Sequence, residues 1–256
     1  MSRILSIGAG VMGTAITIPA VSNGHEAKIV GTSLDEEIID SINKNSVHPK
    51  LNVQLTNTSA LLFNQMTQED IDNSDVIVIG INSSGIDWFI ELIKNFKVVN
   101  KKFLIVTKGL YMNEKKELDI FPNKIKNEIK QDLSLTAVTG PCKAVELAKK
   151  NLTNICFVNS DLDTAINLAN LFKNDYYVIK SQSDLLGAEL CAALKNVYAI
   201  AVGYSQTYFS KEEKIFNPES ALFSHCVNEM SYLVTLMGGL PETVFSLSGL
   251  GDLHVT

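Results

Sequence analysis

The sequence predicts an α/β protein with a doubly wound, mostly parallel β-sheet followed by a smaller all-helical domain. Three observations predict this fold. Short apolar, β-branched runs alternate with helical patterns in the first part of the chain. A glycine-rich turn joins the first strand to the first helix, and strand patterns stop near Ser181. Strands separated by helices favour a parallel sheet, because parallel neighbours need a crossover connection.

The first part of the chain contains six predicted strands. Two of them, VIVIGI and FLIV, are uniformly apolar, which is typical of strands buried on both faces of a parallel sheet. The predicted strands cover residues 3–7, 27–30, 76–81, 103–106, 135–138 and 155–158, and the first predicted helices cover residues 11–22 and 35–44.

The last part of the chain has helical periodicity. Ser183 is a candidate N-cap for a long helix that reaches Gly203. Asn217 or Pro218 begins a second helix that ends at Gly238-Gly239, and Pro241 begins a short third one. We therefore expect a dinucleotide-binding domain over 1–181 and a helical substrate domain over 182–256.

Composition and charge limit the function. The chain has 256 residues, 46% hydrophobic and 20% charged, which is ordinary globular composition. Its net charge of −6 argues against nucleic-acid binding but allows an anionic small-molecule substrate. Four cysteines without a C-x-x-C pair indicate neither a metal site nor a disulfide framework, and they fit a reducing cytoplasm.

The apolar run over residues 4–21 has an alternative interpretation as a signal peptide. Its glycines stand at a functional spacing, which favours a strand, turn and helix instead. No later stretch is expected to be long and apolar enough for a membrane helix.

The turn Gly8-Ala9-Gly10-Val11-Met12-Gly13 matches the pattern GxGxxG. It follows a strand and opens a helix, which is the context that a dinucleotide site requires. Gly8 permits the tight turn, Gly10 lets the backbone approach the pyrophosphate, and Gly13 lets helix and strand pack closely. These observations predict a Rossmann-type NAD or NADP site. A turn without a ligand is the alternative.

The residues after the second strand leave the choice between NAD and NADP open. An acid there normally binds the ribose hydroxyls, but this chain has Gly31-Thr32-Ser33, and Asp35 lies farther on. We take Thr32 as a cofactor contact.

Two lysines are candidates for chemistry. Lys195 is the only charge in LCAALKNVYAIAVG, and no carboxylate lies three or four residues away. It is either a solvent-facing lysine or a desolvated one with a lowered pKa that can exchange a proton. Lys108 follows the FLIV strand, at the edge of the sheet where ligands bind, and a plain loop lysine is the alternative.

The sequence does not decide the function of two further turns. The segment Gly140-Pro141-Cys142-Lys143-Ala144 joins a strand to a helix and could present backbone N–H groups to an anion. The segment Gly249-Leu250-Gly251-Asp252 has a plain turn as its default interpretation.

Taken together, these segments resemble the NAD(P)-dependent glycerol-3-phosphate dehydrogenase family. The matching pieces span nearly the whole chain in the family's order. They are GAGVMGTA, HPKL, TKGL, TGPCKAVELA, GAELCAALKNVYAIAVG and SGLGDLHVT. ELCAALKN and GLGDL are the specific ones, since the glycine turn is shared with many dehydrogenases.

The resemblance implies reversible hydride transfer between NAD(P)H and dihydroxyacetone phosphate, which gives sn-glycerol 3-phosphate for glycerophospholipid synthesis. It implies catalytic roles for Lys195, Lys108 and Asp252. It also implies cofactor and substrate contacts at further positions. The cofactor contacts are Gly8, Gly10, Val11, Met12, Gly13, Thr32, Lys108 and Ala144, and the substrate contacts are Lys108, Gly140, Cys142, Lys195, Asp252 and Thr256.

This sequence departs from the family pattern in two ways. Cys142 stands where the family usually has serine, which weakens a hydrogen bond there. The family continues beyond the position of Thr256 with an Arg-Asn pair, whose arginine binds the substrate phosphate, and with more helices. The helical domain is therefore expected to be incomplete. Either the chain is a fragment, or a lysine or another chain supplies the phosphate contact, or the substrate binds poorly. A homodimer would cover the apolar surface that an incomplete helical domain leaves exposed.

Two alternatives keep the dinucleotide site but change the function. One is a dehydrogenase of the 3-hydroxyacid type, which also combines a glycine-turn domain with a lysine on a helix. The other is a non-catalytic NAD(P)-binding protein.

Overall fold

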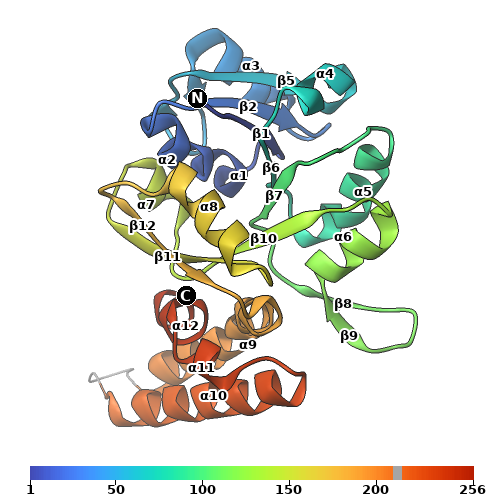
Figure 1. Ribbon diagram of the computed structural model, residues 1–256. Coiled ribbons are helices and arrows are strands. Elements are labelled where there is room, and N and C mark those ends of the chain that lie inside the picture. Colours follow the sequence, from blue (N-terminus) through green and yellow to red (C-terminus); the bar gives the residue numbers. More distant parts are fainter. Residues whose placement is uncertain (210–214) are drawn as a thin grey trace.

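An eight-stranded β-sheet in the order β12-β11-β10-β7-β6-β1-β2-β5 forms the centre of the protein (Figure 1). The computed structural model describes residues 1–209 and 215–256. Every neighbouring pair in this sheet is parallel except β10 and β11. The strands are β1 (Arg3–Ile7), β2 (Glu26–Gly31), β5 (Thr58–Leu62), β6 (Val76–Ile79), β7 (Lys102–Ile105), β10 (Ser134–Thr139), β11 (Thr153–Val158) and β12 (Tyr177–Gln182).

The six strands predicted from the sequence are confirmed, and the doubly wound sheet with them. The two edge strands β5 and β12 were not predicted, because each is only partly buried and lacks a continuous apolar run. Two small hairpins were also missed, β3 (Val47–His48) with β4 (Val53–Gln54) and β8 (Leu110–Met112) with β9 (Leu118–Ile120).

Helices cover both faces of the sheet. One face carries α1 (Val11–Ala15), α2 (Thr17–Ser22), α3 (Glu36–Asn45), α7 (Ala144–Ala148) and α8 (Leu162–Phe172), and the other carries α4 (Gln68–Asp72), α5 (Ile86–Lys94) and α6 (Phe121–Ile129). The prediction of one helix over 11–22 is wrong, because α1 ends at Ala15 and α2 begins at Thr17. Pro19 explains the break: it has no N–H for the Ala15 carbonyl, and its ring crowds that carbonyl.

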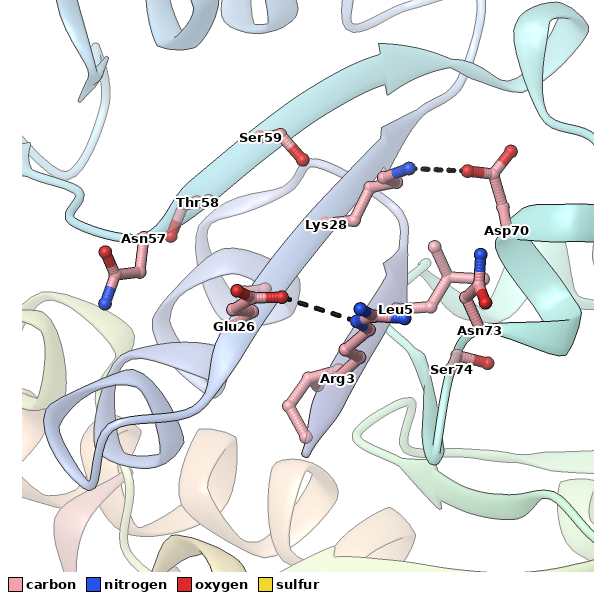
Figure 2. A pocket seen from close by; sticks show the side chains of 12 residues that line it. Arg3, Leu5, Glu26, Lys28, Asn57, Thr58, Ser59, Asp70, Asn73 and Ser74 are labelled. Carbon is pink, nitrogen blue, oxygen red and sulfur yellow. Dashed lines mark hydrogen bonds and ion pairs between the residues drawn. The ribbon is translucent and has the colours of Figure 1, made fainter. Parts of the chain in front are cut away.

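A hollow of about 460 Å³ lies at the amino ends of β1, β2 and β5 (Figure 2). Two ion pairs line it. Arg3 Nε lies 3.4 Å from Glu26 Oε2, and Lys28 Nζ lies 2.6 Å from Asp70 Oδ1. We call this region the amino-edge hollow.

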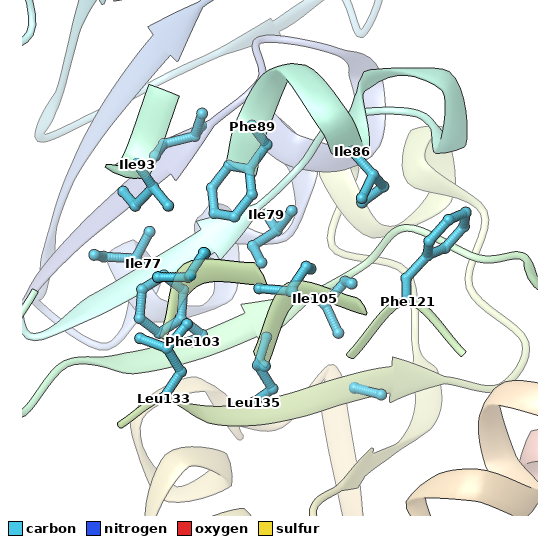
Figure 3. Close-up of a cluster of buried hydrophobic side chains, with 14 of the residues drawn as sticks. Ile77, Ile79, Ile86, Phe89, Ile93, Phe103, Ile105, Phe121, Leu133 and Leu135 are labelled. Carbon is cyan, nitrogen blue, oxygen red and sulfur yellow. The ribbon is translucent and has the colours of Figure 1, made fainter. Parts of the chain in front are cut away.

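The larger apolar core lies between the central strands and helices α5 and α6 (Figure 3). Ile77 on β6, Phe103 on β7 and Leu135 on β10 face Phe89 on α5, and all four side chains are inaccessible to solvent. This core fixes the carboxyl ends of β6, β7 and β10, which carry the candidate site.

The helical unit packs against the β10–β11 side of the sheet (Figure 1). It consists of α9 (Leu185–Phe209), α10 (Asn217–Leu236), α11 (Pro241–Val244), a π-helical turn η3 (Leu247–Gly251) and α12 (Asp252–Val255). The predicted end of the long helix at Gly203 is wrong. Gly203 sits in open space inside α9, where it costs only about 1 kcal/mol of helix propensity. The domain division at residue 181 stays a prediction.

Helix α9 is long and apolar enough to cross a membrane by length and composition, so the expectation that no later stretch has these properties is wrong. Half of its most apolar window is buried inside the protein. Among the described residues it is the one such helix, so there is no clear membrane span. The apolar run at the N-terminus forms β1, α1 and α2, with β1 inside the sheet.

Candidate active site

The glycine-rich turn lies between β1 and α1, as predicted. Gly8 has φ +113°, and a Cβ there would lie 2.5 Å from the Gly80 carbonyl oxygen. A Cβ at Gly13 would lie 2.4 Å from the Gly8 carbonyl oxygen, so both glycines are required by packing. Gly10 differs, since its Cβ would have no neighbour closer than 3.9 Å. This open space suits the close backbone approach that a dinucleotide pyrophosphate makes in this fold, so the residues present fit the cofactor.

Gly80 was missed in the sequence. It directly follows β6, and a Cβ there would lie 2.6 Å from the Cα of Gly13. The signal was available, because a glycine after a buried parallel strand often marks a close backbone approach.

The predicted cofactor contacts follow neighbouring strands along the carboxyl edge of the sheet. Thr32 follows β2, the glycine turn follows β1, and Lys108 follows β7. Three strand spacings separate β2 from β7, roughly 14 Å. An acid does lie at the end of β2, because the Thr32 N–H and hydroxyl both donate to Asp35 Oδ2, at 2.8 and 2.7 Å. Sequence spacing alone had placed Asp35 too far away.

A cavity of about 260 Å³ opens at this edge, between the glycine turn and the segments that follow β7 and β10. It brings together five residues predicted as cofactor or substrate contacts. The lining residues are Met12, Val106, Lys108, Val138, Gly140, Cys142 and Ala144.

Two lysines share one buried carboxylate beside this cavity. Lys195 Nζ on α9 lies 2.5 Å from Asp252 Oδ1, and Lys108 Nζ lies 2.6 Å from Asp252 Oδ2. Asp252 is 1% exposed and is the first residue of α12. The default interpretation of GLGD as a plain turn is therefore wrong, because η3 and α12 carry its acid onto both lysines.

Lys195 is buried, with only 8% of its surface exposed, so a solvent-facing lysine is excluded. Burial lowers the pKa of its ammonium group, the nearby charge of Lys108 lowers it further, and Asp252 partly opposes both. A lysine in this environment releases its proton more readily than an exposed one, which is the property that a proton-transfer group needs.

Thr256 also reaches Lys195. The Thr256 hydroxyl lies 2.9 Å from Lys195 Nζ, from which it accepts, and it donates to the Asp252 carbonyl oxygen at 2.7 Å. The turn that carries Asp252 is tied to the sheet by Ser248, whose hydroxyl lies 2.7 Å from that of Thr139 at the end of β10. Sequence reasoning missed this buried pair, because 109 residues separate its members.

A buried acid that is close enough to feel the charge of Lys108 was also missed. Glu189 lies on α9, is 1% exposed, and its Oε2 has no hydrogen-bond partner. Burial raises the pKa of this carboxyl to about 8, while the charge of Lys108 acts in the opposite direction. Glu189 is therefore mostly neutral at pH 7, and Asp252 supplies the negative charge opposite the two lysines.

Cys142 lines the cavity as a neutral thiol. Burial raises the pKa of its thiol to about 12, so it offers a weak hydrogen-bond donor where the family usually has a hydroxyl. Over residues 1–209 and 215–256, no three acidic, histidine or cysteine side chains are grouped so as to hold a metal ion.

The dinucleotide-type sheet, the open glycine turn and the buried lysine pair define a nicotinamide-dependent dehydrogenase. The comparisons with known proteins specify which one. Residues 3–165 match the family model for the NAD-dependent glycerol-3-phosphate dehydrogenase N-terminus, and residues 184–256 match the model for its C-terminus. The chain belongs to the NAD-dependent glycerol-3-phosphate dehydrogenase family.

Relatives and solved structures agree with this assignment. The NADP(+)-dependent glycerol-3-phosphate dehydrogenase of Archaeoglobus fulgidus is 32% identical over 98% of this chain and 74% of its own length. The glycerol-3-phosphate dehydrogenase [NAD(P)+] of Bacillus anthracis is 27% identical over 100% of this chain and 73% of its own. The crystal structure of glycerol-3-phosphate dehydrogenase from Coxiella burnetii has the same fold, with a TM-score of 0.85 at 23% identity, covering 99% of this chain and 75% of that one.

Proposed function

We propose that this chain transfers a hydride between NAD(P)H and dihydroxyacetone phosphate, giving sn-glycerol 3-phosphate, with Lys195 as the proton-transfer residue. The observation that carries the proposal is the Lys195–Asp252–Lys108 cluster beside the cavity at the glycine turn. A small phosphorylated substrate fits a positively charged group of this kind.

In this mechanism NAD(P)H, when bound, supplies the hydride. Negative charge then develops on the substrate's carbonyl oxygen. Protonated Lys195 donates a proton to that oxygen, and in the reverse reaction it removes the proton from the hydroxyl group. Lys108 adds fixed positive charge near the oxygen, and Asp252 orients both ammonium groups through its two carboxylate oxygens.

The further cofactor and substrate assignments are those that the family resemblance implies. Gly8, Gly10, Val11, Met12, Gly13, Thr32 and Ala144 would contact the dinucleotide, and Gly140, Cys142 and Thr256 the substrate. The cysteines support a cytoplasmic location, since all four are free thiols. A homodimer also remains a proposal, supported by the exposed apolar side chains Val197 and Ile200 on α9 and Tyr232 on α10.

The test is Lys195→Ala, assayed for turnover and for NADPH binding. We expect turnover to fall by about 10²–10⁴ while the Kd for NADPH stays nearly unchanged, because Lys195 acts on the substrate oxygen and not on the glycine turn. Lys149→Ala is the matched control, because Lys149 is an exposed lysine at the end of α7.

Three results would contradict the proposal. Loss of both turnover and binding in Lys195→Ala makes Lys195 structural. Faster turnover of small 3-oxo acids than of dihydroxyacetone phosphate makes the chain a dehydrogenase of the 3-hydroxyacid type. NADPH binding by the wild-type chain without any oxidation in the presence of dihydroxyacetone phosphate makes it a non-catalytic binding protein.

A further inference from the structure

His48 is a buried histidine that the mechanism above does not use. It lies on β3, and none of its surface is exposed. Its Nε2 lies 2.9 Å from the carbonyl oxygen of Ala9, the residue between Gly8 and Gly10 in the glycine-rich turn. A hairpin outside the main sheet thus contacts the turn at one backbone atom.

The other ring nitrogen of His48 identifies the tautomer. The Leu51 N–H donates to Nδ1 at 3.2 Å, so Nδ1 acts as an acceptor and carries no proton. Nε2 therefore carries the hydrogen and donates it to the Ala9 carbonyl. Only the neutral Nε2–H form makes both hydrogen bonds. Protonation would put a hydrogen on Nδ1, which would then face the Leu51 N–H as a second donor.

The Ala9 carbonyl and the Gly10 N–H belong to the same peptide group. This peptide is trans, so the two bonds point in nearly opposite directions. Holding the carbonyl toward His48 therefore directs the Gly10 N–H away from the β3–β4 hairpin. Gly10 is also the glycine whose missing side chain leaves open space.

We propose that His48 is a positioning residue for the cofactor: by holding the Ala9 carbonyl, its neutral form aims the Gly10 N–H at the dinucleotide pyrophosphate. This inference rests on the proposed function only for the kind of ligand, since it concerns binding and not hydride transfer. It predicts that dinucleotide affinity falls when His48 is protonated, because a hydrogen on Nδ1 would oppose the Leu51 N–H and displace the ring from the Ala9 carbonyl.

The surroundings of His48 lower its pKa from the ordinary value of an imidazole. Burial lowers the pKa of the imidazole below its usual 6.5. The hydrogen bond to Ala9 acts against that, the charge of Lys50 on the β3–β4 turn lowers the pKa further, and Asp35 before α3 raises it. The neutral form therefore predominates at pH 7.

The experiment measures the Kd of ADP-ribose by calorimetry between pH 5 and pH 8. ADP-ribose carries the pyrophosphate, has no nicotinamide, and is not consumed. For the wild-type protein we expect a constant Kd near neutral pH and a rise of up to tenfold per pH unit below the His48 pKa, as one linked proton requires. The melting temperature of the unliganded protein is recorded at each pH.

Three variants separate positioning from folding. In His48→Gln the amide can still donate to Ala9 but does not titrate, so affinity is largely kept and its pH dependence is lost. In His48→Asn the shorter side chain can accept from Leu51 but cannot reach Ala9, so the Kd rises about tenfold at pH 7. His25→Gln is the matched control, since the His25 Nδ1 also accepts a backbone N–H, that of Ser2, but at the amino edge of the sheet. Its binding profile should match that of the wild type.

Two outcomes overturn the inference. A Kd that keeps its pH dependence in His48→Gln assigns the titration to another group. A lower melting temperature in His48→Asn with an unchanged Kd makes His48 a folding residue only. Failure of the proposed function is a different result, because a protein that binds ADP-ribose with this pH profile but does not reduce dihydroxyacetone phosphate retains the role of His48.

Discussion

The sheet has a hollow at each edge, and the two differ in how their charges are paired. The amino-edge hollow is the larger, about 460 Å³ against about 260 Å³ for the cavity at the glycine turn. Its charges are matched one to one, Arg3 with Glu26 and Lys28 with Asp70. Beside the smaller cavity the lysine pair shares the single carboxylate of Asp252.

The difference teaches that charge imbalance, and not volume, marks the site in this protein. Paired surface charges are close to their lowest free energy and gain little from a ligand. The lysine pair keeps an excess positive charge in a buried place, which an anionic substrate can neutralise. The neutral thiol of Cys142 and the mostly neutral Glu189 leave that excess in place.

Among the variants that compare the two edges, the largest effect is expected from Asp252→Asn, which removes the carboxylate that the two lysines share. Turnover of dihydroxyacetone phosphate should fall on the order of 10²-fold or more, because Lys195 is no longer held toward the substrate. The free energy of unfolding should fall by about 3 kcal/mol, since two neighbouring ammonium groups are left without a counter-charge. Urea unfolding and steady-state kinetics measure these quantities.

The matched variant at the other edge is Glu26→Gln. Its ion pair with Arg3 is about half exposed on both sides, so we expect less than about 1 kcal/mol of lost stability and unchanged turnover. Equal losses in Asp252→Asn and Glu26→Gln would remove the distinction between the two edges.

Local sequence patterns predicted the centre of the fold better than its edges. Strand β6 is uniformly apolar, and β7 is apolar after Lys102, because both of their faces are covered, and that pattern is readable without a structure. Strand β12 alternates between buried and exposed positions and ends in polar residues, so its pattern is weaker. The break at Ile16 between α1 and α2 could have been predicted from Pro19 alone.

The residues of the candidate site also differ in how well local sequence predicts them. The place of the glycine turn and of Lys108 at the carboxyl edge was readable, because each follows a buried strand. Local patterns gave no partner for Lys195, because Asp252 is 57 residues away and only the packing of α12 on α9 brings them together. The family resemblance alone implied a shared role for the two residues. Glu189 and His48 lie inside segments that resemble the family, but their roles were not predicted, because their burial and their contacts come from distant segments.

A smaller, more diagnostic effect is expected from Lys108→Met. Lys195 must be protonated to act as the acid in reduction, so the rate falls as pH rises through its pKa. The charge of Lys108 is the second cause, after burial, that lowers this pKa. Removing it should raise the pKa of Lys195 and move the basic limb of kcat/KM to higher pH, while the plateau falls about tenfold or more.

Lys108→Arg is the control for that shift, because it keeps the charge and should leave the basic limb near its wild-type position. A limb that stays in place in Lys108→Met would mean that the titrating group is not Lys195. The lysine pair would then no longer distinguish the carboxyl edge from the amino edge through the chemistry of Lys195, although the cavity would remain.

The smallest effect is predicted for Arg3→Met at the amino-edge hollow. Arg3 is the only arginine in the sequence, and a guanidinium is the natural partner of a substrate phosphate. Arg3 is nevertheless the first residue of β1, whereas the glycine turn follows the last, so the two lie at opposite edges of the sheet. We therefore expect the KM for dihydroxyacetone phosphate in Arg3→Met to stay within about twofold of wild type, because exposed charges beyond a Debye length of about 10 Å are largely screened. A KM that rises tenfold would mean that the larger hollow takes part in substrate binding after all, and that paired charges do not identify the unused edge.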